Sequence, residues 1–426
     1  MRVQVHAAGV NGVDGKMASG VSGEVNYPLS SDGRSRHGRS RGIEASQVAL
    51  VSCQGYDEAS IAEAVGRAFG LLGGPERFAH AGERILLKPN LLAGSTPEEL
   101  VSPHPTVFRG VVKQLQRVGA ELSYGDSPGF GSSHAVARKA GIAAVADEEG
   151  VTLADFKEGR IVSFPEGRLV KQFTVATSVL DADGLVSIAK LKTHGLTRMT
   201  GAVKNTFGCI PGLLKGEFHV RMGTVDRFSQ MLVDLNALLA PRLFVMDAVV
   251  AMEGNGPRGG DPHRLGALLV SSDPVALDAV ACRIIGLDTA LVPPIAYGER
   301  WGLGNGSFER IELLGDPVES FVDASFVVDR SQLRTREPGM LSRLLKNQLV
   351  PKPVIDRGRC DVCGTCVKVC PVEPKAVDFV PGAPGEKAAP PVHFYDRCIR
   401  CYCCQEMCPA GAIVIRRPIL SRIIHR

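Results

Sequence analysis

The chain has 426 residues, of which 44% are hydrophobic, and a formal net charge of +4. The charge is too small for this length to indicate a polyanionic partner, and an aromatic content of 5% argues against base stacking, so we expect no nucleic-acid binding. No apolar run reaches the length of about 18 residues that a membrane helix needs, which predicts no transmembrane segment. The length predicts two or three domains.

The first 45 residues are rich in Gly, Ser and Arg and contain no unbroken apolar stretch. This composition predicts a disordered lead-in rather than a signal peptide, with a basic arm for an acidic partner as the alternative. Because no secretory signal is recognised, we expect the protein in the reducing cytoplasm, where free thiols survive.

Apolar strands and amphipathic helices alternate from residue 46 onward. Residues 48–51 and 85–87 are continuous apolar runs, and between them apolar residues recur at the spacing of a helix that Asp57 is expected to cap. The later strands are expected at residues 121–125, 184–189, 243–247 and 267–271. The later helices are expected at residues 107–115, 132–140, 225–239 and 274–285. This alternation predicts an α/β domain at residues 46–329, with a mostly parallel sheet flanked by helices.

Polar residues follow directly after five of these strands. In parallel α/β sheets the ligand crevice lies outside the carboxyl ends of the strands, so the pattern predicts one shared site. Lys190, Lys192 and His194 form the strongest set, because their two-residue spacing places them on one face if the strand continues. Several lysines together suit a carboxylate or phosphate, which predicts an anionic small-molecule ligand. The residues expected to bind it are Lys88, Asn90, Lys190, Lys192, Lys204 and Asn205.

The same site could transfer protons if the protein is an enzyme. The residues expected in this catalytic role are Asp126, His194 and Asp247. A metal held by the carboxylates of Asp126, Asp247 and Glu253 is a further hypothesis. The alternatives to a ligand site are structural roles. The polar residues after the second strand could serve merely to shape a turn, and Asp126 and Asp273 could cap helices. The lysines could form a solvent-exposed edge of the sheet.

A glycine-rich segment at residues 254–260 matches the letters of the dinucleotide fingerprint, GxGxxG. In that fingerprint a helix begins within the motif, so that its N-terminus meets the pyrophosphate. Here Pro257 and Pro262 intervene, and a strand is expected next. We therefore interpret the segment as a wide loop and not as a nucleotide site.

Residues 330–358 are expected to form a linker, and eight cysteines follow it in two copies of one pattern. Each copy reads CxxCxxCxxxCP, which is typical of bacterial ferredoxins that hold two [4Fe–4S] clusters. In such domains the fourth cysteine of each run binds the other cluster. The first cluster is expected to take Cys360, Cys363, Cys366 and Cys408. The second cluster is expected to take Cys398, Cys401, Cys404 and Cys370.

Residues 359–415 are therefore predicted to form a small α+β ferredoxin-like domain, followed by a basic tail at residues 416–426. Zinc also binds paired cysteines, but it takes four ligands per ion and does not need a third cysteine at this spacing. Cys403 lies outside the pattern, beside Cys404. We expect it to be a bystander thiol near the cluster, with ligand exchange or a redox role as the alternatives.

Several of these segments together resemble the domain-of-unknown-function-362 family (DUF362). The shared motifs lie at residues 86–90 (LLKPN), 125–129 (GDSPG), 189–194 (AKLKTH), 203–205 (VKN), 246–247 (MD), 253–257 (EGNGP) and 272–278 (SDPVALD). Members often end in a two-cluster ferredoxin like that at residues 398–409, and the resemblance covers roughly residues 46–415. It implies the architecture above and a cytoplasmic iron–sulfur protein, and it implies no settled reaction.

This organisation predicts a protein of one of two functional classes. In the first, the protein is an oxidoreductase whose clusters pass electrons to an anionic small substrate bound by the α/β domain. In the second, it is a non-catalytic electron-transfer or binding protein, whose clusters relay electrons to a redox partner protein or stabilise the fold. An enzyme requires a closed pocket that is lined by the strand-end residues and has a cluster close by, whereas a carrier requires an exposed cluster and no pocket.

Overall fold

The computed structural model describes residues 45–212, 214–331, 346–380 and 389–418. The predicted lead-in, about half of the predicted linker and most of the predicted basic tail lie outside these ranges. None of the helices within the described ranges is both long and apolar enough to cross a membrane.

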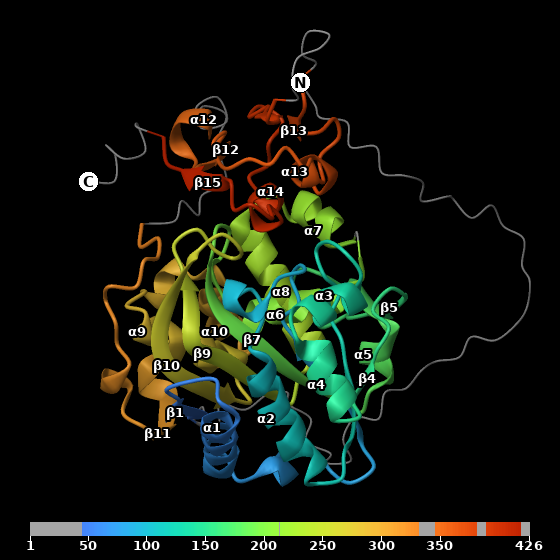
Figure 1. Ribbon diagram of the computed structural model, residues 1–426, viewed down its shortest axis with the longest axis vertical. Coiled ribbons are helices and arrows are strands. Elements are labelled where there is room, and N and C mark those ends of the chain that lie inside the picture. The colour runs from blue at the N-terminus through green and yellow to red at the C-terminus, as the bar shows by residue number, and fades with distance from the viewer. Residues whose placement is uncertain (1–44, 213, 332–345, 381–388, 419–426) are drawn as a thin grey trace, which may run out of the picture. The chain divides into compact units, whose positions relative to one another are not determined.

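A nine-stranded mixed sheet forms the centre of the α/β region (Figure 1). Its strands are β1 (Ser46–Ser52), β2 (Arg84–Pro89), β3 (Glu121–Tyr124), β4 (Thr152–Leu153), β7 (Gly184–His194), β8 (Arg198–Thr200), β9 (Leu243–Glu253), β10 (Asp261–Ser271) and β11 (Ile311–Gly315). They are ordered β11-β1-β10-β9-β7-β2-β3-β4, with β8 beside β7. Strands β9, β7, β2, β3 and β4 run parallel, whereas β10 is antiparallel to both of its neighbours. The predicted fold class is therefore confirmed, with antiparallel pairing towards one edge.

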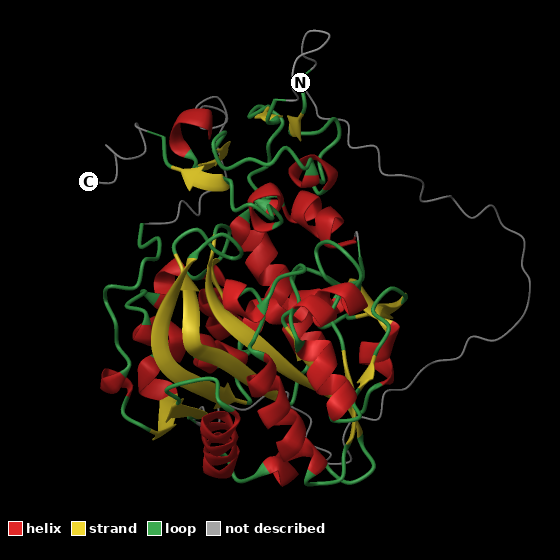
Figure 2. Cartoon of the chain, in the orientation of Figure 1, coloured by secondary structure: helices red, strands yellow, loops and turns green. Residues whose placement is uncertain are grey.

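Helices cover both faces of this sheet (Figure 2). Neighbouring residues of one strand point to opposite faces, so Ile85 and Leu87 enter one apolar core and Leu86 enters the other. The first core also takes residues from α1 (Glu58–Leu71), α2 (Pro105–Gln116), α3 (Ser133–Lys139) and α4 (Ile142–Glu148). The second takes residues from α6 (Ala202–Asn205), α8 (Val225–Leu239), α9 (Pro274–Ile284) and α10 (Pro293–Trp301). Burial on both faces explains why the strands are continuous apolar runs.

Aspartate side chains begin some of these helices. Asp57 caps α1 as predicted, and Asp273 caps α9 by accepting from the backbone N–H of Val275 at 2.8 Å. Asp126 does not cap the helix that follows it, because Ser132 takes that position before α3. The structural interpretation therefore holds for Asp273 and is wrong for Asp126.

Two strands extend beyond their predicted ends. The strand expected to end at residue 189 is β7, which continues to His194 and pairs there with β8. The strand expected to end at residue 247 is β9, which continues to Glu253 and pairs with β10 as an antiparallel partner. The glycine-rich segment at residues 254–260 is the connection between β9 and β10, which agrees with its interpretation as a loop.

Shorter elements complete the α/β region and form the cysteine-bearing region. In the α/β region these are β5 (Gly159–Ser163), β6 (Gln172–Ala176), α5 (Thr177–Asp181) and α7 (Leu214–Met222). In the cysteine-bearing region they are α12 (Lys346–Leu349), β12 (Lys352–Ile355), α13 (Thr365–Lys368), β13 (Val377–Asp378), β14 (Val392–His393), α14 (Cys403–Glu406) and β15 (Ile413–Arg416). Strands β12 and β15 pair antiparallel, as do β13 and β14. The α/β and cysteine-bearing regions belong to one compact unit.

Both cysteine runs fold in the same way. In each run the second and fourth residues after the first cysteine have a left-handed backbone, and a one-turn helix follows. These left-handed residues are Val362 and Gly364 in the first run and Arg400 and Tyr402 in the second. The internal repeat that is visible in the sequence is therefore also a repeat of backbone conformation.

Candidate functional site

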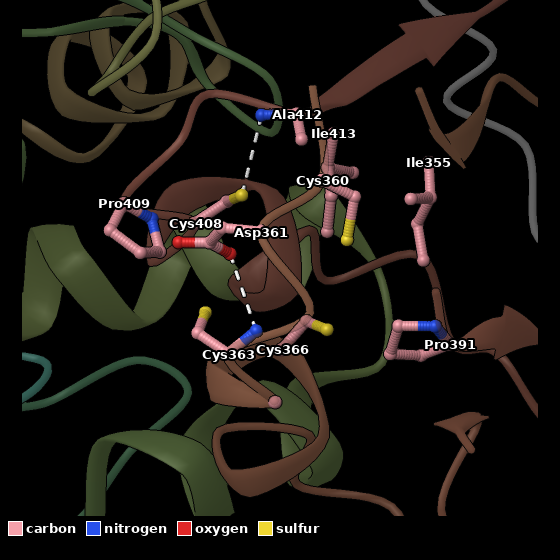
Figure 3. Close-up of a pocket in the computed structure, with 11 residues that line it drawn as sticks. Ile355, Cys360, Asp361, Cys363, Cys366, Pro391, Cys408, Pro409, Ala412 and Ile413 are labelled. Carbon is pink, nitrogen blue, oxygen red and sulfur yellow. Dashed lines mark hydrogen bonds between the residues drawn. The ribbon is translucent and has the colours of Figure 1, made fainter. Parts of the chain in front are cut away.

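The first three cysteines of the first run surround a pocket together with the last cysteine of the second run (Figure 3). Cys360 and Cys363 lie on the turn before α13, Cys366 lies in that helix, and Cys408 follows α14. The backbone N–H of Ala412 donates to the Cys408 sulfur at 3.3 Å. Four soft sulfur donors around one pocket, one of them already accepting a backbone hydrogen bond, fit a [4Fe–4S] cluster.

The remaining four cysteines of the pattern are also close together. Burial raises the pKa of the Cys404 thiol, and the charges of Cys401, Cys398 and Cys370, together with that of Cys366 from the first set, raise it further. The backbone N–H of Ala376 donates to the Cys370 sulfur at 3.4 Å, as Ala412 does for Cys408. Like thiolates repel one another unless a bound metal group supplies positive charge, so this set also fits a cluster.

A single metal ion does not fit the described residues. No three His, Cys, Asp or Glu side chains converge closely enough within the described ranges to hold one ion. Among the described residues, the carboxylates of Asp126, Asp247 and Glu253 do not form one group, and they contact Lys88, Lys190 and His263 respectively.

Lys88 and Asp126 form a buried ion pair at the carboxyl ends of β2 and β3. The Lys88 Nζ lies 3.0 Å from Asp126 Oδ2 and donates to Asn205 Oδ1 at 2.9 Å. The second oxygen of Asp126 is buried without a hydrogen-bond partner among the described residues, and so is the side-chain oxygen of Asn90. A Cβ at Gly208 would lie 1.8 Å from that free Asp126 oxygen, so the backbone can approach it only as glycine.

A second buried pair joins β7 and β9. The Lys190 Nζ lies 2.9 Å from Asp247 Oδ2 and donates to the Tyr56 hydroxyl at 2.8 Å. That hydroxyl donates to Asp247 Oδ1 at 2.9 Å, and the Tyr56 ring stacks on His104 with centroids 4.0 Å apart. Tyr56 and His104 were not predicted, because neither stands directly after a strand of the apolar pattern.

A third group lies where β7 meets the cysteine-bearing region. His194 Nε2 lies 3.3 Å from Glu406 Oε1, and the Lys204 Nζ lies 3.4 Å from the same oxygen. The backbone N–H of Leu196 donates to His194 Nδ1 at 3.0 Å, which leaves the Nε2 proton of the neutral ring to face Glu406. Glu406 was not predicted, because it lies among the cluster cysteines, more than 200 residues from its partners.

Burial sets the protonation of this third group. It lowers the pKa of His194 to about 4, with the positive charge of Lys204 acting in the same direction. It also lowers the pKa of Lys192 far below its usual value, again with Lys204 contributing. Burial opposes ionisation of Glu406, but Lys204, His194 and His219 together outweigh it and hold the pKa of Glu406 well below its usual range. At neutral pH the group therefore contains an anionic Glu406 and a neutral His194.

Among the residues that the structure describes, no carboxylate is a direct partner of Lys192. Its Nζ donates to the carbonyl oxygen of Val101 at 2.5 Å, and the side chain is buried. Lys215, which was not predicted, donates to Ser127 Oγ at 2.7 Å, beside Asp126 in the sequence. The structure thus brings the predicted residues to the same end of the sheet in three groups, each of which contains a carboxylate.

The cysteine-bearing region contacts this end of the sheet directly. Gln405 Nε2 donates to the carbonyl oxygen of Gly256 at 2.9 Å, and Asn255 Nδ2 donates to that of Ile413 at 3.0 Å. Gln405 and Glu406 lie between the ligand candidates Cys404 and Cys408. The second cysteine run is therefore packed against the carboxyl ends of β7 and β9.

Comparison with known proteins yields two family matches. Residues 85–283 match the domain of unknown function DUF362, and residues 352–412 match the 4Fe-4S dicluster domain. The thylakoid-associated protein sll1697 of Synechocystis sp. is 37% identical over 281 residues, which cover 65% of this chain and 86% of that protein.

Two solved structures show a weak likeness. The lactate racemase apoprotein of Thermoanaerobacterium thermosaccharolyticum matches with 11% identity and a TM-score of 0.37, and the match covers 57% of each chain. A structural-genomics protein of Thermotoga maritima matches with 14% identity and a TM-score of 0.30, over 51% of this chain and 56% of that one. The chain thus spans little more than half the length of either structure.

Proposed function

Because the chain belongs to the DUF362 family and carries a 4Fe–4S dicluster domain, we propose that it is an oxidoreductase acting on an anionic small molecule. The dicluster domain itself supports an iron–sulfur electron-transfer protein. In the proposal, the two cysteine sets described above hold two [4Fe–4S] clusters, which supply single electrons when bound. The α/β region holds the electron acceptor at the carboxyl ends of its strands.

The observation that carries the proposal is the position of Glu406. This residue lies between Cys404 and Cys408, and its carboxylate contacts both His194 and Lys204. One side chain therefore joins the second cysteine run to the strand-end residues. An electron carrier with an unrelated α/β domain has no need for such a contact, whereas an enzyme needs its redox group beside its substrate site.

The charges of the site suggest separate roles for its lysines. Lys88 and Lys190 are already neutralised by Asp126 and Asp247, so they fix these carboxylates in place. Lys204 lies beside the Glu406 carboxylate, so Lys192 is the lysine that remains for the anionic group of the substrate. The bound anion would also raise the pKa of Lys192, because an opposite charge nearby favours the charged form.

Proton supply can come from the same residues. The carboxylate of Asp126, whose second oxygen is buried without a donor among the described residues, can take a proton from water and pass it to the substrate, and the neutral His194 holds Glu406 through its Nε2 proton. These positions fit the transfer of one proton for each electron that the substrate takes up.

Reoxidation of the reduced protein tests this proposal. The anaerobic holo-protein is reduced, freed of reductant and mixed with a panel of small carboxylates and phosphorylated compounds that contain a reducible group. We expect at least one compound to reoxidise it, and Lys192→Met to slow that reaction at least tenfold. Lys157→Met, a change at an exposed lysine, is the control and should react like the wild type. A panel without any reactive member, or equal rates in both variants, would count against the proposal.

Electron relay to a partner protein is the second candidate function, and the exposure of Cys363 favours it. A cluster with an exposed ligand can exchange electrons with another protein at the surface. The cytoplasmic location also stays a proposal, and the Synechocystis relative is named for its association with thylakoids.

A further inference from the structure

Arg258 lies in the loop of residues 254–260, between β9 and β10. Its Nη1 donates to the carbonyl oxygen of Met407 at 3.0 Å, and its Nη2 donates to that of Gly94 at 3.0 Å. The side chain comes from the α/β region and reaches the residue that precedes Cys408. Two neutral carbonyl groups thus fix the guanidinium beside the first cysteine pocket.

The positive charge of Arg258 has no ion-pair partner in the described parts of the chain, and its buried Nε lacks a hydrogen-bond partner there. Burial lowers the pKa of Arg258, and the negative charges that oppose this are those of Glu99, Cys408 and Cys363. Glu99 is itself engaged, because its carboxylate accepts from the backbone N–H of Thr96 at 2.7 Å. A half-buried cation without a partner is costly, so a negative group in the adjacent pocket would offset that cost.

The shape of the loop agrees with a role in docking. A Cβ at Gly259 would lie 2.8 Å from the Cα of Gly411, so the two backbones approach as closely as they do only because both residues are glycines. Asn255 and Gln405 add the hydrogen bonds described above. The glycines that match the letters of the dinucleotide fingerprint therefore allow the loop to place Arg258 beside the cysteine-bearing region.

We propose that Arg258 is the counter-charge of the cluster held by Cys360, Cys363, Cys366 and Cys408, and that it raises the reduction potential of this cluster. The inference rests on the proposed function, in which these cysteines hold that cluster. A [4Fe–4S] cluster with four thiolates is negative and gains one more negative charge on reduction. A fixed positive charge beside it therefore stabilises the reduced form more than the oxidised form.

A redox titration of the anaerobic holo-protein, followed by electron paramagnetic resonance, tests this role. Arg258→Gln should shift the reduction equilibrium of the first cluster about tenfold towards the oxidised form, which is about 59 mV for one electron. The second cluster should titrate as in the wild type. A Cys370→Ser variant, which alters the second cluster, identifies the two signals.

Two further variants separate charge from contact. Arg258→Lys keeps the charge and should leave the potential close to that of the wild type. Arg359→Gln removes an arginine that stands next to Cys360 but is mostly exposed, so solvent screens its charge and the potential should not change. An Arg258→Gln protein with full iron and sulfide content and wild-type potentials would overturn the proposal.

Arg258→His tests the role of the charge within a single variant, because the charge at this position can be changed by pH alone. Its imidazole is charged below and neutral above a pH of about 6.5, so the potential of the first cluster should fall with rising pH more steeply than in the wild type. Parallel pH curves for the two proteins would overturn the proposal. Iron and sulfide analysis of the wild type comes first, because a protein that assembles no cluster would overturn the proposed function as well.

Discussion

Lys88 and Lys190 are two buried lysines that each depend on a single carboxylate. Their nitrogens lie 3.0 Å from Asp126 and 2.9 Å from Asp247, and all four side chains are almost completely buried. In a buried ion pair, attraction offsets desolvation only while both partners are present. These pairs therefore make the strand ends rigid and at the same time sensitive to single substitutions.

Asp247→Asn should lower the free energy of unfolding by about 3 kcal/mol, because it leaves Lys190 buried without a counter-charge. Anaerobic urea denaturation followed by circular dichroism measures this loss. The double variant Lys190→Met, Asp247→Leu should lose less than Asp247→Asn alone, since it removes both charges. A loss no larger than that of the exposed-site control Lys157→Met would contradict the account.

His194 should make stability fall in mild acid. Its pKa is about 4 in the folded protein and about 6.5 in the unfolded chain, so the unfolded chain binds the extra proton between these values. The neutral ring makes its full contribution to the free energy of unfolding above a pH of about 6.5. This contribution, about 3 kcal/mol in all, is lost as the pH falls towards about 4.

His194→Gln should therefore show a smaller drop in its urea midpoint between pH 7.5 and 5 than the wild type. His80→Gln, at an exposed histidine, should keep the full drop. Equal drops in the two variants would mean that His194 does not titrate as described.

The cysteine turns and the strands show how far an element can be predicted from sequence. Each CxxCxxC run folds into a local turn and a one-turn helix, so its conformation depends on residues that are close in the sequence. The apolar strands were also predictable, since both of their faces are buried. The last residues of β7 were not, because Lys192 and His194 are buried through polar contacts that a hydrophobic pattern does not register.

Cys403 occupies the same position in the second run as Thr365 does in the first. The Thr365 hydroxyl lies 3.3 Å from the Cys363 sulfur, and Cys403 hydrogen-bonds Cys401 in the same way. A cluster ligand would project to the cluster instead, so Cys403→Thr should leave the iron and sulfide content unchanged. Loss of about half of the iron would show that Cys403 is a ligand. Thr365→Val is the matched variant at the equivalent position.

At the scale of the whole molecule, the second cysteine run and the strand-end residues form one connected structure. Sequence patterns located each part, but they could not show that the parts meet. Glu406 and His194 are 212 positions apart, and neither carries a signal for the other. Their contact is supported by the loop of residues 254–260, which also joins the two regions. In the sequence, the glycines of this loop match the letters of the dinucleotide fingerprint instead.

The central claim is that a bound anion and the second cluster influence each other. An anion beside Lys192 and Lys204 disfavours the negative charge that reduction adds, so the cluster potential and the anion affinity are linked reciprocally. The direct measurement is a redox titration of the holo-protein with and without inorganic phosphate as the probe, followed by electron paramagnetic resonance.

We predict that phosphate lowers the potential of the cluster held by Cys398, Cys401, Cys404 and Cys370 and leaves the other cluster unchanged. The shift should disappear in Lys192→Met and remain in Lys157→Met. Unchanged potentials in the wild type, or a shift that survives in Lys192→Met, would contradict the claim that the strand-end site and the second cluster act together.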